Sequence, residues 1–181
     1  EWLSDQGWNE GEPFVCLLVR DSAYLGKDSL HGRGDSASFK RWEYHDYRDS
    51  EIDTYVKAME WLADEKVWVL RMGKLMHKPI SSNHPRIIDY AFHPKRNELL
   101  DIWLFANCTG CISTSTGIDS VSHMYGIPML FVNQMAFRHL KTSHHSITVP
   151  KNHYWAKNNK KLKLKEIFTT NSTNSYTLEN E

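Results

Sequence analysis

The sequence has few cysteines, no long hydrophobic run and no excess of charge of either sign. Its 181 residues include three cysteines, an odd number that argues against a disulfide framework and favours a reducing compartment. No apolar run approaches the ~20 residues that a membrane-spanning helix needs, and no basic and then apolar signal peptide opens the chain. We therefore expect a soluble protein of the cytoplasm.

The charge balance bears on the class of partner. Lys and Arg together number 22, as do Asp and Glu, so the formal net charge is zero. Non-specific binding to nucleic acid needs a basic excess, so we expect no nucleic-acid partner. The one strongly basic stretch runs from Lys157 to Lys165. Such a run is typical of a solvated face, and the alternative is a peripheral contact with an anionic membrane surface.

Motifs of three common enzyme folds are also missing. No G-x-G-x-x-G follows a predicted strand, no Walker sequence occurs, and there is no G-x-S-x-G. These absences count against a dinucleotide-binding fold, a P-loop kinase and an α/β-hydrolase. Cys108 and Cys111 have the C-x-x-C spacing, but no second pair completes a zinc site, so we expect buried structural thiols and no metal.

What the sequence does contain is an alternation of buried strands with helices. Apolar runs predict strands at residues 14–19, 67–70, 86–90, 110–112 and 128–132, the last of these being the final strand. Helical spacing predicts helices at residues 50–62, 97–107 and 118–125. Residues 97–107 are apolar nearly all round, which predicts a buried helix, and Ser50 with Asp53 fits a capping box at the start of the first helix. Residues 26–47 predict a long functional loop.

Strands that alternate with helices indicate βαβ units. We therefore expect a three-layer α/β domain with a mainly parallel sheet over residues 1–168, followed by a frayed polar tail at 169–181.

Polar side chains follow three of the predicted strands, where an open parallel sheet binds its ligands. They are Arg20-Asp21-Ser22, Arg71-Met72-Gly73 and Ser113-Thr114-Ser115-Thr116-Gly117. A hydroxyl-rich turn before a helix offers donors to a phosphate, and two arginines can neutralise a diphosphate through forked hydrogen bonds. The alternative is ordinary helix caps and surface salt bridges. Because three such segments meet on one predicted edge, an anion site is favoured.

Five segments, in this order, resemble a bacterial family of glycosyltransferases that is often encoded in surface-polysaccharide gene clusters. They are residues 14–25, 45–52, 67–73, 100–106 and 112–121. Residues 147–151 and 164–167 resemble it too, so the resemblance covers residues 14–168. More remotely, the strand that ends in Val19-Arg20 and the Ser/Thr turn are similar to the fucosyltransferase-type GT-B fold. The resemblance implies a Rossmann-like domain equivalent to the C-terminal, donor-binding half of such an enzyme.

The resemblance also implies roles for individual residues. Arg20 would hold the pyrophosphate of a nucleotide-sugar donor and stabilise its charge as the sugar leaves. Ser113, Thr114, Ser115 and Thr116 would bind the phosphates or ribose. Apart from the resemblance, the strand-end pattern predicts that Gly117 allows a close backbone approach and that Arg71 helps to neutralise the diphosphate. His45, Tyr47 and Arg48 would face the donor or the acceptor. Asp21 and His45 join Arg20 as catalytic candidates, and Asp21, His31 and Asp46 are candidates for the general base.

The implied function is transfer of a sugar to a glycan or a lipid-linked acceptor, without a cofactor or metal. Because a GT-B enzyme has two Rossmann-like domains and this chain has room for one, we expect the acceptor-binding half to lie upstream of Glu1. The alternative function is that of a non-catalytic module that binds a nucleotide or a sugar phosphate.

Overall fold

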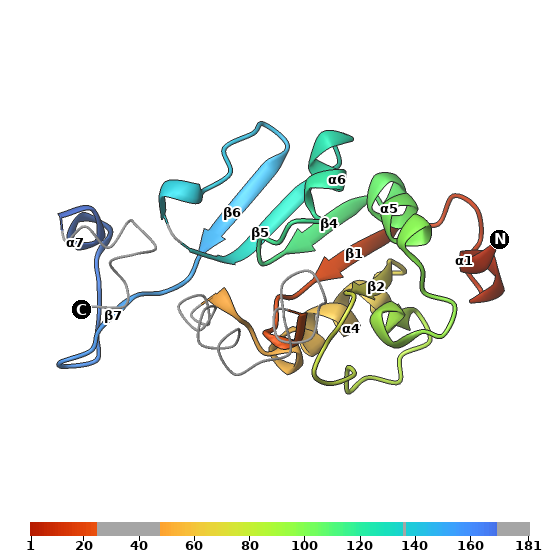
Figure 1. The fold of residues 1–181 in the computed structure, drawn as a ribbon, viewed down its shortest axis with the longest axis horizontal. Coiled ribbons are helices and arrows are strands. Elements are labelled where there is room, and N and C mark those ends of the chain that lie inside the picture. The colour runs from red at the N-terminus through yellow and green to blue at the C-terminus, as the bar shows by residue number, and fades with distance from the viewer. Residues whose placement is uncertain (25–47, 136, 170–181) are drawn as a thin grey trace.

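The computed structural model describes residues 1–24, 48–135 and 137–169, and its centre is a six-stranded sheet (Figure 1). The order is β3-β2-β1-β4-β5-β6, and each neighbouring pair is parallel. The strands are β1 (Phe14–Leu18), β2 (Trp68–Met72), β3 (Ile87–Ile88), β4 (Gly110–Ser113), β5 (Met129–Gln134) and β6 (Ser146–Pro150). This is the strand order of Rossmann-type doubly wound sheets. The predicted α/β class with a mainly parallel sheet is confirmed.

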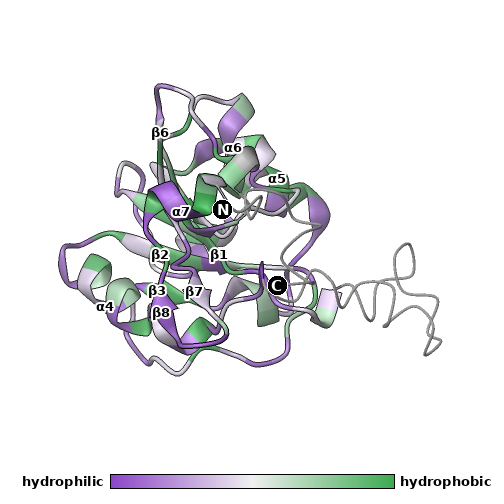
Figure 2. Ribbon diagram, turned by 90° about the vertical axis from the view of Figure 1, so that its left-hand side faces the viewer, coloured by the Kyte–Doolittle hydropathy of each residue, from purple (hydrophilic) through white to green (hydrophobic). Residues whose placement is uncertain are grey.

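Helices cover both faces of the sheet, as Figure 2 shows. The longer helices are α4 (Val56–Asp64), which continues the 3-10 turn η2 (Ile52–Tyr55), and α5 (Glu98–Asn107). The short ones are α1 (Trp2–Asp5), η3 (Tyr90–Phe92), α6 (Ser120–Met124), η4 (Phe137–His139) and α7 (Leu164–Thr169). A small hairpin of β7 (Tyr154–Trp155) and β8 (Lys160–Lys161) precedes α7.

The central strand β1 explains why the first apolar run is continuous. Cys16 and Leu18 pack in the core beneath α5, whereas Leu17 and Val19 pack in the core beneath α4. All four are 5 % exposed or less. A strand that is buried on both faces needs apolar residues at successive positions rather than at alternate ones.

Two predictions about helices are corrected. The helix at Glu98–Asn107 is not buried all round, because Leu99, Ile102 and Trp103 are 79 %, 48 % and 45 % exposed. An outer-layer helix packs on the sheet through one stripe, and the other apolar residues stay on the surface. The capping box at Ser50 is not formed either: the 3-10 turn before α4 begins after Glu51, which makes no side-chain cap bond.

A third correction concerns the end of the sheet. Residues 128–132 are not the last strand, because β6 follows and pairs with β5 in parallel. Its sequence alternates polar and apolar residues, with Ile147 and Val149 exposed, and it ends at Pro150. Edge strands tolerate proline, and this pattern lacks the continuous apolar run that marks an inner strand. The lysines of the basic run at 157–165 are all exposed.

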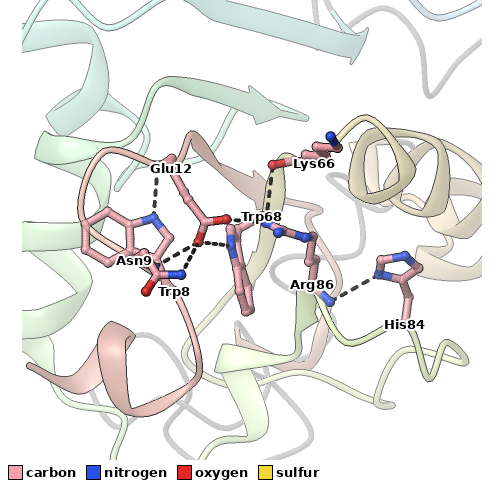
Figure 3. Close-up of polar contacts among 7 residues, drawn as sticks. All are labelled: Trp8, Asn9, Glu12, Lys66, Trp68, His84 and Arg86. Carbon is pink, nitrogen blue, oxygen red and sulfur yellow. Dashed lines mark hydrogen bonds and ion pairs between the residues drawn. The ribbon is translucent and has the colours of Figure 1, made fainter.

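Glu12 joins the N-terminal segment to the sheet (Figure 3). Its carboxylate accepts hydrogen bonds from the Asn9 N–H at 2.8 Å, the Trp68 indole at 3.1 Å and the Arg86 guanidinium at 2.8 Å. The Arg86 guanidinium also lies 5.3 Å from the centre of the Trp68 ring. The Asn9 N–H, followed by Arg86, lowers the pKa of Glu12 from 4.5 to about 2.

This pKa predicts how Glu12→Gln changes stability with pH. The hydrogen bonds to Glu12 favour its charged form in the folded chain, and the unfolded chain lacks them. The stabilisation that they give is therefore complete above pH 4.5 and disappears as the pH falls towards 2. We expect the melting temperature of Glu12→Gln to lie below that of the wild type at pH 7, with the gap closing between pH 4.5 and 2. Thermal unfolding at several pH values measures this, with exposed Glu10→Gln as the control. A gap that does not change with pH would contradict it.

Candidate functional site

A cavity of about 690 Å³ lies at the carboxyl edge of the sheet, beside the ends of β1, β2 and β4. The strand order reverses there, because β2 lies on one side of β1 and β4 on the other. In open α/β sheets, the crevice at such a reversal is the usual place for a ligand. The cavity is also within the size range of small-molecule sites, ~300–1,000 Å³.

Arg20 leaves β1 at this edge with its backbone fixed on two sides. Its N–H donates to the Thr114 hydroxyl at 2.8 Å, and its carbonyl accepts from the Ser50 N–H at 3.1 Å. The guanidinium Nε donates to Asp49 at 3.0 Å. Within the described part of the chain, the two terminal nitrogens of Arg20 make no hydrogen bond. The side chain lines the cavity and is 15 % exposed, so its remaining donors are available to a ligand.

The turn after β4 divides the predicted hydroxyl residues into two groups. Ser113 is fully buried and donates to Asp119 at 2.5 Å, while its oxygen accepts from the Ser115 N–H at 3.0 Å. Asp119 also accepts from the Thr116 N–H at 2.8 Å. Burial raises the pKa of Asp119, and these two hydrogen bonds oppose the rise. Ser113 and Thr114 therefore support the turn from inside.

The remaining residues of the turn face the cavity. Ser115, Thr116 and Gly117 line it, and Ser115 has the left-handed φ of 65° that sharpens the turn. A Cβ added at Gly117 would meet no atom within 4 Å, so the space beside this backbone is open. Arg48 donates to the Ser115 carbonyl at 2.9 Å and also lines the cavity. The structure thus brings Arg20, Arg48 and the end of this turn together at one cavity.

Asp21 lines the same cavity, but its oxygens hold backbone. One oxygen accepts from the Ala23 N–H at 2.8 Å and the other from the His77 N–H at 3.0 Å. These bonds join the end of β1 to the loop that follows β2.

Arg71 does not line this cavity, which corrects the prediction that it adds charge there; the end of β2 reaches the cavity through Met72, Gly73 and Lys74 instead. Arg71 lies within β2 opposite Leu17, and its side chain is 1 % exposed. Its guanidinium donates to Asp89 at 2.9 Å and to the Lys78 carbonyl at 3.3 Å. Neighbouring side chains of a strand point to opposite faces. Because β2 extends to Met72, Arg71 points away from the α5 face and does not line the cavity.

Several predicted residues lie outside the described part of the chain. They are His31, His45, Asp46, Tyr47 and the tail at 170–181. Their roles stay predictions. The three cysteines are buried and free, as expected. Among residues 1–24, 48–135 and 137–169, no three His, Cys, Asp or Glu side chains group as metal ligands.

The sequence pattern did not indicate four charged residues of the cavity: Lys74, Arg96, Glu98 and Asp101. Lys74 directly follows the glycine after β2. Arg96 precedes Asn97, whose side chain accepts the Leu100 N–H and so marks the start of α5. The chain between a parallel strand and its crossover helix lies at the carboxyl edge. The position of Arg96 just before the predicted start of a helix is therefore the signal in the sequence that could have found it.

Comparisons with protein-family models, with curated proteins and with solved structures found no match to this chain. Among the described residues, no helix is long and apolar enough to cross a membrane.

The buried position of Arg71 predicts a large effect on stability. Arg71→Met removes the ion pair and leaves Asp89, which is 16 % exposed, without its cation. Breaking a buried pair by removing one partner typically costs about 3–5 kcal/mol. We expect the free energy of unfolding of Arg71→Met, measured in urea, to fall by this amount. The control Arg86→Met removes a more exposed arginine from its pair with Glu12 and should cost less. Equal losses for the two variants would contradict a special role for burial.

Proposed function

We propose that the cavity binds the diphosphate of a nucleotide sugar, and that the chain is the donor-binding domain of a glycosyltransferase. The acceptor is a glycan or a lipid-linked molecule, as the family resemblance implies. One observation supports this most: Arg20 and the turn at 115–117 border one cavity where the strand order reverses. A guanidinium offers forked, charge-assisted hydrogen bonds that suit phosphate oxygens.

The remaining lining suits the rest of such a donor. Apolar side chains also line the cavity: Met72, Leu75 and Met76 at the end of β2 and in the loop after it, Ile102 and Phe105 on α5, and Ile118 before α6. Ligand sites typically combine such a lining with a few polar groups that fix orientation. A nucleobase or a sugar ring fits the apolar part while the diphosphate lies near the arginines.

The chemistry that these residues can perform is mainly electrostatic. When the bond between the sugar and the diphosphate breaks, negative charge builds up on the departing phosphate. A preorganised guanidinium at Arg20 stabilises that charge, and the cavity positions the donor for attack by the acceptor. Arginines can neutralise this charge without a metal ion.

The second candidate function is a non-catalytic module that binds a nucleotide or a sugar phosphate. The state of the acidic side chains favours it. Asp21 holds two backbone N–H groups, Asp101 pairs with Arg96 at 2.5 Å, and Glu98 pairs with Lys74 at 3.3 Å. Each carboxylate among the described residues that line the cavity has at least one partner, and the single buried oxygen without one, Asp101 Oδ1, belongs to a carboxylate paired with Arg96. No unpaired carboxylate is therefore present among these described residues as a general base. Release of nucleoside diphosphate from a nucleotide sugar distinguishes an enzyme from such a module, which binds the donor without turnover.

The proposal predicts the effect of Arg20→Lys on ligand binding. Calorimetry with GDP, UDP, CDP and ADP should show that the wild type binds at least one of them below millimolar concentration. Lys keeps the charge but loses the fork, and losing one charged hydrogen bond of ~1.5–3 kcal/mol weakens binding about ten- to more than a hundredfold.

Stability separates this role from a structural one. If Arg20 binds the ligand, the melting temperature of Arg20→Lys stays close to that of the wild type, because a partly exposed ion pair such as that with Asp49 contributes under ~1 kcal/mol. Arg86→Lys, which lies away from the cavity, is the matched control and should bind the nucleotide as the wild type does. A destabilised Arg20→Lys with unchanged affinity would contradict the proposal.

A further inference from the structure

The cavity has a second charged side, formed by Arg96 and Asp101. Arg96 lies just before α5, and Asp101 lies in its first turn. The Arg96 guanidinium donates to Asp101 at 2.5 Å, and the two side chains are 16 % and 9 % exposed. Both line the cavity, as Arg20 does from the end of β1. The cations at Arg20 and Arg96 therefore come from different elements that border one space.

Three residues that line this cavity each have a buried polar atom without a partner among the described residues. These atoms are Arg96 Nε, Asp101 Oδ1 and Thr116 Oγ1. Leaving a buried donor or acceptor unsatisfied costs ~1–3 kcal/mol, so such atoms in a folded chain need an explanation. Arg96 Nε and the Thr116 hydroxyl can both donate a hydrogen bond, and phosphate oxygens accept hydrogen bonds.

Asp101 fixes the direction of the Arg96 guanidinium. Its Oδ2 holds one terminal nitrogen of Arg96, while Arg96 Nε is buried and has no hydrogen-bond partner among the described residues. The Asp101 charge also acts on the Tyr90 hydroxyl, whose pKa is raised first by burial and further by Asp101. A guanidinium held by a carboxylate in this way is preorganised and loses less side-chain freedom when it binds an anion.

We propose that Arg96, oriented by Asp101, is a second anion-binding arginine of this cavity. It takes the phosphoryl group that Arg20 does not hold, so the site selects diphosphates over monophosphates. This inference rests on the proposed function, because it assigns the second half of the same diphosphate. Arg96 binds the ligand directly, and Asp101 is a positioning residue.

Calorimetry with inorganic pyrophosphate and inorganic phosphate tests this on the full chain. We expect the wild type to bind pyrophosphate more tightly than phosphate. Arg96→Lys should weaken the affinity for pyrophosphate about tenfold or more, because lysine cannot make the forked hydrogen bonds of a guanidinium, and it should affect the affinity for phosphate less. Asp101→Asn keeps the shape but not the charge, and should also reduce the preference for pyrophosphate. A merely structural defect would leave the ratio of the two affinities unchanged. Arg86→Lys is the control and should bind both ligands as the wild type does.

A second measurement needs no variant, so it holds even if Arg96→Lys does not fold. Phenylglyoxal modifies accessible arginines, and mass spectrometry locates the modified residues. We expect pyrophosphate to protect both Arg20 and Arg96 in the wild type, and to leave Arg86 reactive.

The outcomes distinguish the two proposals. If pyrophosphate protects Arg20 but not Arg96, or if Arg96→Lys and Asp101→Asn keep the wild-type preference, the assignment of Arg96 is wrong and the donor site at Arg20 stands. If the wild type binds neither pyrophosphate nor any nucleoside diphosphate, the proposed function fails, and the assignment of Arg96 fails with it.

Discussion

The parallel pairing of β1 with β4 is the constraint on which the candidate site depends. The ladder runs from Val15 opposite Gly110 to Leu18 opposite Ser113. It continues beyond the strands, because the Thr114 N–H donates to the Leu18 carbonyl at 3.1 Å and the Arg20 N–H donates to the Thr114 hydroxyl at 2.8 Å. Two segments that are more than ninety residues apart in sequence thus leave the sheet at one point. Any ligand between them meets the Arg20 guanidinium from one strand and the turn at 115–117 from the other.

Buried hydrogen bonds keep this edge in place. On the inner side of the turn, Asp119 accepts hydrogen bonds from the Ser113 hydroxyl and the Thr116 N–H. Asp21 holds the loop after β2 against the end of β1. Such buried groups are costly unless each is satisfied. The polar residues near the cavity therefore divide into those that shape its backbone and those, such as Arg20, Arg96 and Thr116, that line it and keep a polar atom without a partner among the described residues.

The sequence predicts the sheet well and the cavity only in part. Continuous apolar runs mark β1 and β2 because both faces of these strands are buried, whereas β6 at the edge has no such run. Arg71 shows the limit of a strand-end argument. The apolar run ends at Leu70, but β2 continues to Met72, so Arg71 lies inside the strand, and its side chain points to the face opposite that of its two neighbours. The sequence pattern does not fix the end of a strand to within one or two residues. Arg96 and Asp101 belong to a segment whose place beside β1 and β4 is set by how α5 packs on the sheet. That packing depends on long-range contacts, which a local pattern does not show.

The most direct test of a diphosphate site at the β1–β4 edge is a crystal structure with a bound nucleoside diphosphate. We expect its phosphates within hydrogen-bond distance of the Arg20 and Arg96 guanidinium groups and beside the backbone of residues 115–117, with the base or ribose against the apolar side of the cavity. A nucleotide that binds elsewhere on the chain, with this cavity left without phosphate density at saturating ligand, would contradict the site.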